Sequence, residues 1–239
     1  MGISLEDRTV VVIGGTSGIG LAVARLAASN GAKLVVTGRN PAKLDDAGQR
    51  LGASRTAVLD AHDEPALQAF IDQLVDVDHL VSMIGDSMSG GFTTTTPQTM
   101  QHVLKSKFWT NWLIGRLSAP KLRDDGSITF TAGTGGRPHE ISGSYVANLA
   151  IGALVEGLAV ELAPRLRVNA VAPTFMDTPF WKALPRPAFE AAARDFVSHV
   201  PLGRLATVEE VASSYIHLMT NGFITGQVLA VDGGVMANT

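Results

Sequence analysis

The chain has 239 residues, of which 46% are hydrophobic and 17% charged, and its formal net charge is −3. This length suits one large α/β domain or two small domains. The slightly acidic balance argues against a nucleic-acid partner, because nucleic-acid binders carry a surplus of Lys and Arg. The absence of cysteine excludes disulfides, thiolate catalysis, Fe–S clusters and cysteine-based zinc sites. No cluster of His, Asp and Glu suggests another metal site.

No segment is expected to act as a signal peptide or to span a membrane. The first eight residues carry acids and no long apolar stretch. The longest apolar run, residues 146–155, is interrupted by Glu156 and falls short of the roughly 20 residues that a bilayer requires. We therefore expect a cytoplasmic protein without a membrane partner.

Short runs rich in β-branched residues alternate with helical patterns along the chain. Such near-continuous apolar runs are typical of parallel strands that are buried on both faces. The expected strands cover residues 9–13, 33–37, 56–59, 79–83, 127–130, 167–171 and 227–231. Helical spacing is found in residues 19–29, 41–51, 64–74, 99–117, 144–163 and 208–218.

Two of the expected helices carry clear start signals. Glu64 and Pro65 open one helix, and Thr207 with Glu210 forms a capping box for another. Strand–helix alternation over the whole chain predicts an α/β fold, a doubly wound Rossmann-type parallel sheet of about seven strands with helices on both faces. No linker, repeat or charge run divides the chain, so we expect a single domain over residues 1–239.

Residues 174–201 interrupt this alternation. The segment is long and includes Pro179, Pro185 and Pro187, so we expect a loop with a short helix there. A long segment that follows the carboxyl end of a strand lies over the ligand crevice of an open α/β sheet. This position predicts that residues 174–201 form a lid. The apolar residues of the lid favour a hydrophobic or aromatic substrate. The alternative is that they pack the lid onto the body or fill a subunit interface. These residues are Phe175, Met176, Phe180 and Trp181.

A glycine-rich turn links the first expected strand to the first expected helix. Its glycines let the backbone turn tightly and approach a pyrophosphate, whose charge then lies at a helix N-terminus. A strand before the turn and a helix after it are the context that such a site requires. The ligand contacts expected here are Gly14, Thr16, Ser17, Gly18, Ile19 and Gly20.

The spacing Gly14-x-x-x-Gly18-x-Gly20 resembles that of the short-chain dehydrogenase/reductase family. Segments 167–173, 225–227 and 231–234 resemble later motifs of the family in the right order, so the resemblance covers nearly the whole chain. It implies a nicotinamide dinucleotide as cofactor. Asp60, with Ala61 beside it, would face the adenine. Further cofactor contacts implied by the resemblance are Gly85, Pro173 and Thr178.

The end of the second expected strand bears on the choice of cofactor. NAD-binding proteins place an acid there to accept a hydrogen bond from the ribose 2′-hydroxyl. Here Gly38 takes that position and Arg39 follows it. A guanidinium group matches a 2′-phosphate, so NADP(H) is favoured. The alternative is that Arg39 is a solvated surface residue and that the site accepts either cofactor.

The proton-transfer residues of the family are not in their usual places. The resemblance implies a Tyr as proton donor, a Lys one helical turn later, an upstream Ser and an Asn on the fourth helix. Tyr145 is followed four residues later by Leu149 instead of Lys. Counting back from Glu161 puts Ser144 at the Tyr position and Asn148 at the Lys position. Thirteen residues before Ser144, Thr131 takes the Ser position. Counting back thirteen residues from Pro120 puts Lys107 at the Asn position.

These replacements favour reduction over alcohol oxidation. A neutral Asn does not lower the pKa of a neighbour by charge, and a free Tyr with a pKa of about 10 is a poor base at neutral pH. Reduction needs a hydride donor, an oriented substrate and some proton donor, for which Lys107 and Tyr145 are the candidates. The alternatives are that Lys107 is an ordinary helix lysine, that Tyr145 serves packing, and that Ser144 and Asn148 only support the start of their helix.

Three functions remain open from the sequence. The first is an NADP(H)-dependent oxidoreductase that reduces a carbonyl or activated double bond of a small hydrophobic substrate with an altered proton donor. The second is a catalytically inactive NADP(H)-binding protein, and the third is a non-redox enzyme on the same fold. The resemblance also implies a homotetramer or homodimer.

Overall fold

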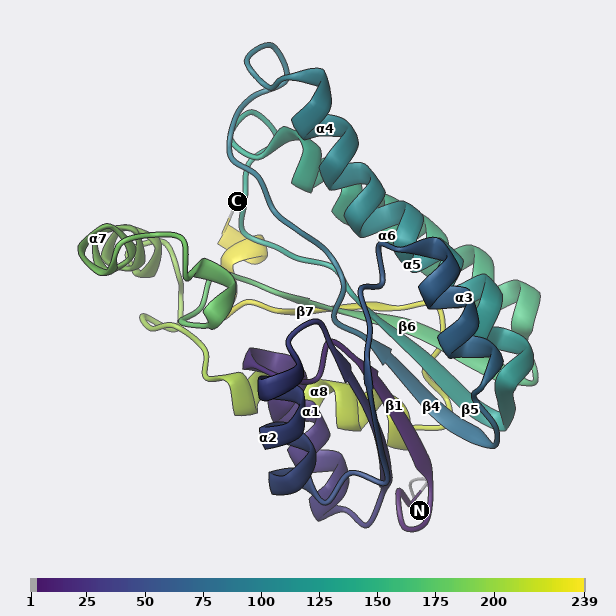
Figure 1. Cartoon of the computed structure of the whole chain (residues 1–239). Helices are drawn as coiled ribbons and strands as arrows, with labels where there is room; N and C mark the ends of the chain where they lie inside the picture. Colours follow the sequence, from purple (N-terminus) through teal and green to yellow (C-terminus); the bar gives the residue numbers. More distant parts are fainter. Residues whose placement is uncertain (1–3, 239) are drawn as a thin grey trace.

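The computed structural model describes residues 4–238 and contains one seven-stranded parallel sheet (Figure 1). The strand order is β3-β2-β1-β4-β5-β6-β7. The chain therefore winds outward from β1 in one direction, crosses over to β4, and winds outward in the other direction. The predicted Rossmann-type doubly wound sheet is confirmed. Residues 1–3, where the N-terminal segment begins, and residue 239 lie outside the described residues.

The strands form where the apolar runs predict them. Strands β1, β4 and β6 are almost completely buried because helices cover both faces of the sheet. The strands are β1 Thr9–Ile13, β2 Lys33–Gly38, β3 Arg55–Val58, β4 Val77–Ser82, β5 Leu122–Thr131, β6 Leu166–Pro173 and β7 Val228–Val231.

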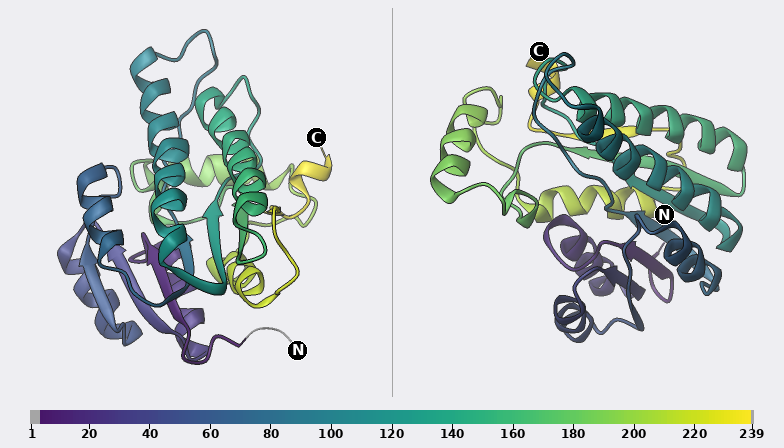
Figure 2. Two further views of the ribbon diagram at one scale, coloured as in Figure 1. Left: turned by 90° about the vertical axis from the view of Figure 1, so that its right-hand side faces the viewer. Right: turned by 45° about the horizontal axis from the view of Figure 1, so that its top comes forward.

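Helices cover the sheet in two layers, which Figure 2 shows from two further sides. Helices α1 Gly18–Ser29, α2 Pro41–Leu51 and α8 Val208–Thr220 lie on one face. The other face carries α3 Glu64–Asp72, α5 Thr110–Ser118 and α6 Ser142–Leu162, and α4 Pro97–Leu104 extends this layer beyond the sheet. Each layer encloses its own hydrophobic cluster against the sheet.

The two predicted helix starts are present. Asp63 caps α3 by accepting a hydrogen bond from the Ala66 N–H at 3.1 Å. At α8, the Thr207 side chain accepts from the Glu210 N–H at 3.2 Å, and the Glu210 carboxylate accepts from the Thr207 N–H at 2.9 Å. This is the reciprocal pair that a capping box requires.

The expected helix over residues 99–117 is three consecutive elements. It begins at Pro97, because Thr96 caps it, and the π-helix η1 Lys105–Trp109 separates α4 from α5. A π turn is an insertion into the helical repeat, often found at functional sites. Strand β5 is also longer than expected. The sequence did not indicate its first half, because that half is mostly exposed and lacks an apolar pattern. It pairs irregularly with β4, and Asp125 within it has a φ of 65°.

The segment 174–201 carries the short 3-10 helix η3 Pro179–Trp181 and the twelve-residue helix α7 Arg186–Val197. In Figures 1 and 2, α7 stands away from both helical layers, beside the end of the sheet where the strands finish. The expected short helix is therefore a full helix of about three turns. Pro185 and Pro187 lie on either side of its first residue, and prolines so close together favoured a loop over a helix in the sequence.

Helix α6 requires a correction. Its 21 residues make it long and apolar enough to cross a membrane by length and composition, so the expectation that no segment reaches that length is wrong. The helix continues through Glu156. In this fold one side of α6, including Ile151 and Val155, is buried in the core cluster, whereas Leu149 and Val160 are exposed. Such a helix is found in protein cores as well as in membranes.

Truncation of Leu67 on α3 should destabilise the fold. Leu67 is fully buried in the cluster beneath α3, so Leu67→Ala should lower the free energy of unfolding by about 2–5 kcal/mol. The matched control is Val75→Ala, because Val75 lies nearby and is 78% exposed; it should change stability by less than about 0.5 kcal/mol. Urea denaturation measures both. Equal losses in the two variants would contradict the packing described here.

Candidate functional site

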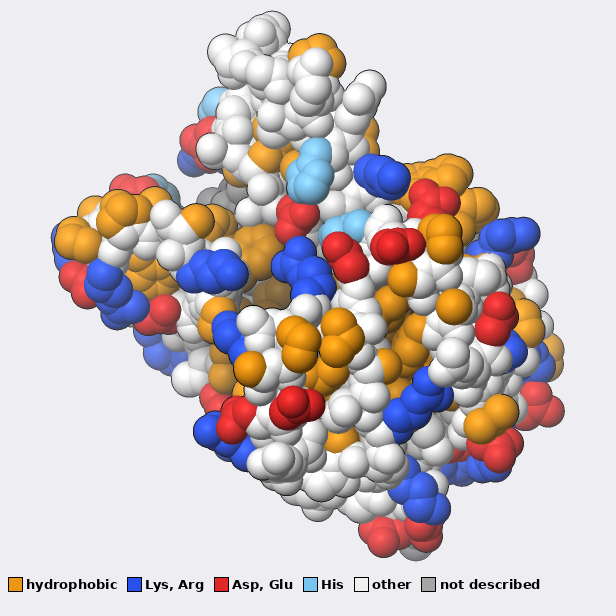
Figure 3. All heavy atoms as spheres, in the orientation of Figure 1, with side chains coloured by type: hydrophobic (Ala, Val, Ile, Leu, Met, Phe, Trp, Pro, Cys, Tyr) orange, Lys and Arg blue, Asp and Glu red, His pale blue; other side chains and the backbone are white. Residues whose placement is uncertain are grey.

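One large cleft of about 1290 Å³ lies at the carboxyl ends of the strands. Its lining comes from the turn after β1, the loops after β4 and β5, η1, α6, and the segment that carries α7. Figure 3 shows the hollow between α7 and the body of the molecule, with basic side chains at its rim. In an open α/β sheet, ligands bind in this crevice because the strand order reverses there.

The glycine-rich turn forms the floor of the cleft beneath α1. Gly14 and Gly18 have φ values of +89° and +52°, which glycine adopts without strain. A Cβ atom on Gly20 would collide with the carbonyl oxygen of Gly14, so only glycine permits this close approach. Ser17 is the N-cap residue of α1, yet its side chain makes no capping hydrogen bond. The start of α1 thus presents free N–H groups and a free hydroxyl, a combination that suits an anionic group.

The end of the cleft near β2 is basic. Arg39 and Lys43 line it, and the sequence analysis missed Lys43. Gly38 is buried against Thr16, and a Cβ atom at position 38 would lie 2.5 Å from Thr16 Cγ2. An acidic side chain at this strand end is absent from the sequence, and any side chain there would require Thr16 to shift. Asp60 lies across this end, and its carboxylate accepts a hydrogen bond from the His62 N–H at 3.1 Å.

The π turn places Lys107 on the wall of the cleft. Asn111 Nδ2 donates to the carbonyl oxygens of Lys107 at 2.5 Å and Ile84 at 3.0 Å, and Asn111 Oδ1 accepts from Ser82 Oγ at 2.6 Å. The Lys107 side chain then lies against Gly85, where a Cβ atom would be 3.0 Å from Lys107 Cγ. Lys107 is only 9% exposed.

The ammonium group of Lys107 is an isolated buried cation. Burial lowers the pKa of Lys107 from 10.5 to about 8, although the nearby Asp86 carboxylate opposes this by favouring the charged form. Across residues 4–238 the ammonium group has no ion-pair partner. Asp86 instead pairs with His102, with its Oδ2 atom 2.9 Å from His102 Nε2. A lysine with a lowered pKa that faces a cleft is typical of functional sites.

Helix α6 contributes Ser144 and Asn148 to the cleft but not Tyr145. Ser144 Oγ accepts a hydrogen bond from the Met88 N–H at 2.8 Å, which fixes the loop after β4. Asn148 Oδ1 is buried beside Gly133 and has no hydrogen-bond partner among the described residues. Tyr145 is the next residue after Ser144, so it projects about 100° further around the helix. In the described structure Tyr145 is not among the residues that line the cleft.

The hydroxyl of Thr131 is already engaged on the far side of β5. It donates to the carbonyl oxygen of Ser82 at 2.7 Å and lies 2.8 Å from the hydroxyl of Tyr215. Burial raises the pKa of Tyr215, so this phenol stays protonated and donates to Thr131. Thr131 lines the cleft, but its oxygen serves as a link between β4, β5 and α8.

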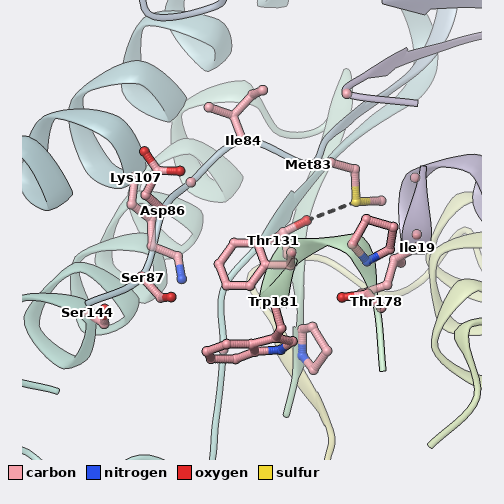
Figure 4. A pocket seen from close by; sticks show the side chains of 18 of the residues that line it. Ile19, Met83, Ile84, Asp86, Ser87, Lys107, Thr131, Ser144, Thr178 and Trp181 are labelled. Atoms are coloured by element: carbon pink, nitrogen blue, oxygen red, sulfur yellow. Dashed lines mark hydrogen bonds between the residues drawn. The ribbon is translucent and has the colours of Figure 1, made fainter. Parts of the chain in front are cut away.

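An aromatic cluster forms the wall opposite Lys107. The ring of Phe175 lies 4.9 Å from that of Trp181, 5.1 Å from that of Phe189 and 5.6 Å from that of Phe196, measured between centroids. Figure 4 shows Lys107 and Ser144 on one side of the cleft and Trp181 and Thr178 on the other. The sequence analysis missed the α7 residues Phe189 and Phe196.

The structure brings most of the predicted site residues together. Of the five predicted catalytic residues, only Tyr145 is absent from the lining of the cleft. The predicted cofactor contacts that line it are Gly14, Thr16, Ser17, Gly18, Ile19, Gly20, Arg39, Asp60, Ala61, Gly85, Pro173 and Thr178. The cleft also includes Asp86 and His102, which no motif in the sequence indicated. No group of three or more potential metal ligands occurs within residues 4–238.

The chain is similar to known proteins in family, sequence and structure. Residues 14–236 match the family model described as enoyl-(acyl carrier protein) reductase. The short-chain dehydrogenase/reductase malC of Malbranchea aurantiaca is 31% identical over 254 residues, covering 97% of this chain and 96% of the relative. The galactitol 2-dehydrogenase (L-tagatose-forming) of Cereibacter sphaeroides is 33% identical over 249 residues, covering 96% and 95%.

Solved structures agree with these sequence matches. A short-chain dehydrogenase/reductase of Brucella melitensis, described as a glucose/ribitol dehydrogenase, superposes with a TM-score of 0.87 at 26% identity. That alignment covers 98% of this chain and 99% of the solved one.

A methyl group at position 20 should prevent the start of α1 from lying close to the carbonyl oxygen of Gly14. Gly20→Ala should weaken dinucleotide binding at least about tenfold, because Gly14 and the helix start must move apart. The control is Gly157→Ala on α6, since a Cβ atom there meets nothing within 4 Å. Isothermal titration calorimetry with NADPH and NADH measures both variants. Unchanged affinity in Gly20→Ala would show that the turn does not hold the ligand.

Proposed function

The chain belongs to the short-chain dehydrogenase/reductase family, and from this premise we propose that it is an NADP(H)-dependent oxidoreductase with Lys107 as its proton donor. Its reaction is the reduction of a carbonyl or an activated double bond of a small hydrophobic substrate. The observation that carries the proposal is the buried, unpaired ammonium group of Lys107 on the wall of the cleft.

The residues of the cleft fit a phosphorylated nicotinamide dinucleotide. The glycine turn and the uncapped start of α1 would hold the pyrophosphate, and Arg39 with Lys43 would hold the 2′-phosphate. The side-chain amide of Asn148, which lines the cleft, would form a hydrogen bond with a ribose hydroxyl. When bound, the reduced cofactor supplies the hydride. Pro173 and Thr178 lie where they would contact its nicotinamide end.

Lys107 supports reduction through both its proton and its charge. An ammonium group with a pKa of about 8 is still protonated at neutral pH and releases its proton more readily than an ordinary lysine. As hydride adds to a carbonyl carbon, negative charge develops on the oxygen, and a buried cation stabilises it strongly. Lys107 then gives its N–H proton to that oxygen and becomes a neutral amine.

The neutral residue Asn148 complements this arrangement. A second ammonium group on α6 would repel that of Lys107 and lower its pKa further. Asn148 instead offers hydrogen bonds without charge, so Lys107 remains the cation of this part of the cleft. Ser144 keeps its own hydroxyl proton, because its oxygen only accepts from Met88, and it would donate to a substrate oxygen. We assign Thr131 a positioning role, since its oxygen is engaged by Tyr215.

The lid segment indicates the character of the substrate. Phe175, Trp181 and Phe196 give the cleft an apolar, aromatic wall opposite Lys107. Such a wall binds flat or hydrophobic groups, while Lys107 and Ser144 select one polar oxygen. We propose that residues 174–201 act as a lid of the single domain and exclude water during the reaction.

Alcohol oxidation fits the same residues poorly. Oxidation requires a base that removes the hydroxyl proton, and Lys107 is already protonated at neutral pH. Only above a pH of about 8 would its neutral amine accept a proton. The favoured direction is therefore reduction.

A catalytically inactive NADP(H)-binding protein is the second candidate. It is favoured by Ser144 and Asn148, which stand where the family resemblance places its proton-transfer pair, and by the absence of Tyr145 from the cleft. Tight NADPH binding without turnover of any substrate would support it. A non-redox reaction on the same fold is not favoured by any feature of the cleft.

We also propose that the chain forms a homodimer or homotetramer in the cytoplasm. Trp109 on η1 and Leu149 and Val160 on α6 expose large apolar side chains on the same helical layer. Such surface is common at subunit interfaces.

The proposal is tested by measuring binding and turnover separately. NADPH binding is followed by fluorescence titration, and NADPH consumption is measured against ketones, quinones, imines and conjugated enones. Binding with turnover of at least one class is the expected result. Absence of NADPH binding would overturn the proposal as a whole.

Arg39 should determine the preference for the phosphorylated cofactor. A charged hydrogen bond to phosphate contributes about 1.5–3 kcal/mol, so Arg39→Ala should weaken NADPH binding roughly 10- to 100-fold. NADH binding should remain within about twofold, because NADH lacks the 2′-phosphate. Arg50→Ala is the control, since Arg50 is exposed on α2 and does not line the cleft. Equal losses for both cofactors would contradict this role.

Lys107 should be required for turnover but not for cofactor binding. Lys107→Met should lower kcat at least about 100-fold while the Kd for NADPH stays within about threefold. In the wild type, kcat should be constant below a pH of about 8 and fall above it, because deprotonation removes the donor. Lys105→Met, which changes an exposed lysine of the same turn, is the control. Tyr145→Phe should leave turnover unchanged, and a large loss in that variant would reassign the donor.

A further inference from the structure

We propose that His102 and Asp86 form a path that returns a proton from solvent to Lys107 after each turnover. This inference rests on the proposed function, in which Lys107 gives its N–H proton to the substrate oxygen and is left as a neutral amine. One proton must then reach Lys107 from water before the next cycle. His102 would take that proton from solvent, and Asp86 would pass it inward.

The exposure of the three residues falls from the surface to the cleft. The side chain of His102 is 64% exposed and that of Asp86 is 41% exposed, whereas Lys107 is only 9% exposed as a residue. His102 Nε2 lies 2.9 Å from Asp86 Oδ2, so a proton can move along a direct hydrogen bond. Imidazole rings exchange protons with water readily near neutral pH, which suits the outermost position.

Asp86 is held in the position that the path requires. Its N–H donates to Ser106 Oγ at 3.2 Å, which ties it to the same π turn that carries Lys107. Figure 4 shows Asp86 beside Lys107 on one wall of the cleft. The Asp86 carboxylate also acts on the charge of Lys107. The two side chains are farther apart than a direct ion pair, so one water molecule would complete the path between them.

A dedicated path is needed because the cleft closes around Lys107. Lys107 is already buried in the structure, and a dinucleotide and a substrate under the lid would cover its remaining exposed surface. His102 lies on α4, lines the cleft and has an exposed side chain, so solvent reaches its imidazole ring. The path therefore works while the front of the cleft is occupied.

The other ionisable groups of the cleft are placed less well to pass a proton to Lys107. The elements packed against η1 are α4, which presents His102, α5, and α6, which presents the neutral Ser144 and Asn148. Asp86 is the group whose charge acts on Lys107. The remaining ionisable side chains of the lining are Arg39, Lys43, Asp60 and His62 at the nucleotide end and Glu140, Lys182 and Asp195 toward the lid.

The kinetic experiment uses His102→Gln, which retains a hydrogen-bonding side chain but does not carry a proton at neutral pH. In weakly buffered solution its steady-state kcat should fall about tenfold, whereas the rate of a single turnover should stay within about twofold. Added imidazole should restore the steady-state rate. His217→Gln, at an exposed position on α8, is the control. An unchanged steady-state rate, or a loss that imidazole does not restore, would overturn the inference.

A second measurement does not depend on activity. NMR of protein labelled with ¹³C-lysine follows the titration of Lys107, whose signal is identified by its absence in Lys107→Met. In the wild type Lys107 should titrate near a pH of about 8, and in Asp86→Asn at a lower pH, with an acid dissociation constant at least about threefold larger. Identical titrations would overturn the link between Asp86 and Lys107. If this shift is present but no substrate is reduced, the proposed function fails while the link stands.

Discussion

The side-chain amide of Asn111 fixes the geometry on which the cleft depends. Its hydrogen bonds join the hydroxyl at the end of β4, the carbonyl oxygen of Ile84 and the carbonyl oxygen of Lys107. These bonds hold the π turn against the loop after β4, so the lysine side chain enters the cleft beside Gly85 instead of pointing to solvent. Burial of an unpaired ammonium group is costly because the group loses its water, and this amide helps to keep the lysine side chain in the cleft despite that cost.

The charges of the cleft are divided between its two ends. Arg39 and Lys43 make the β2 end basic, which suits phosphate groups, whereas Lys107 is a buried cation on the wall opposite the aromatic cluster. Asn148 on α6 adds hydrogen-bonding capacity without charge. The family resemblance implies a tyrosine and a lysine on this helix, but Ser144 and Asn148 line the cleft there, and the buried lysine lies on the neighbouring π turn. Elements η1 and α6 pack against each other, so residues of both reach the same cleft.

The sheet was predictable because each strand is a short apolar run that differs from its flanking segments. The glycine turn was predictable because the spacing of Gly14, Gly18 and Gly20 lets the backbone turn tightly and approach a phosphate group. The π turn was not, since hydrophobic spacing does not reveal an added residue in a helix that stays amphipathic. The engagement of the Thr131 hydroxyl by Tyr215 joins residues 84 positions apart, and no local pattern signals it. The aromatic contacts of Phe189 and Phe196 on α7 with Phe175 were not predicted either, because they join residues that are distant in the sequence.

The contact between Gly38 and Thr16 limits which side chains these two positions accept. Relatives that prefer the unphosphorylated dinucleotide would place a carboxylate at position 38, but Thr16 occupies the space where its Cβ atom would lie. A larger residue at position 38 therefore requires Thr16 to move or to be replaced by a smaller residue. The side chains that positions 16 and 38 tolerate thus depend on each other, and the two positions would have to change together.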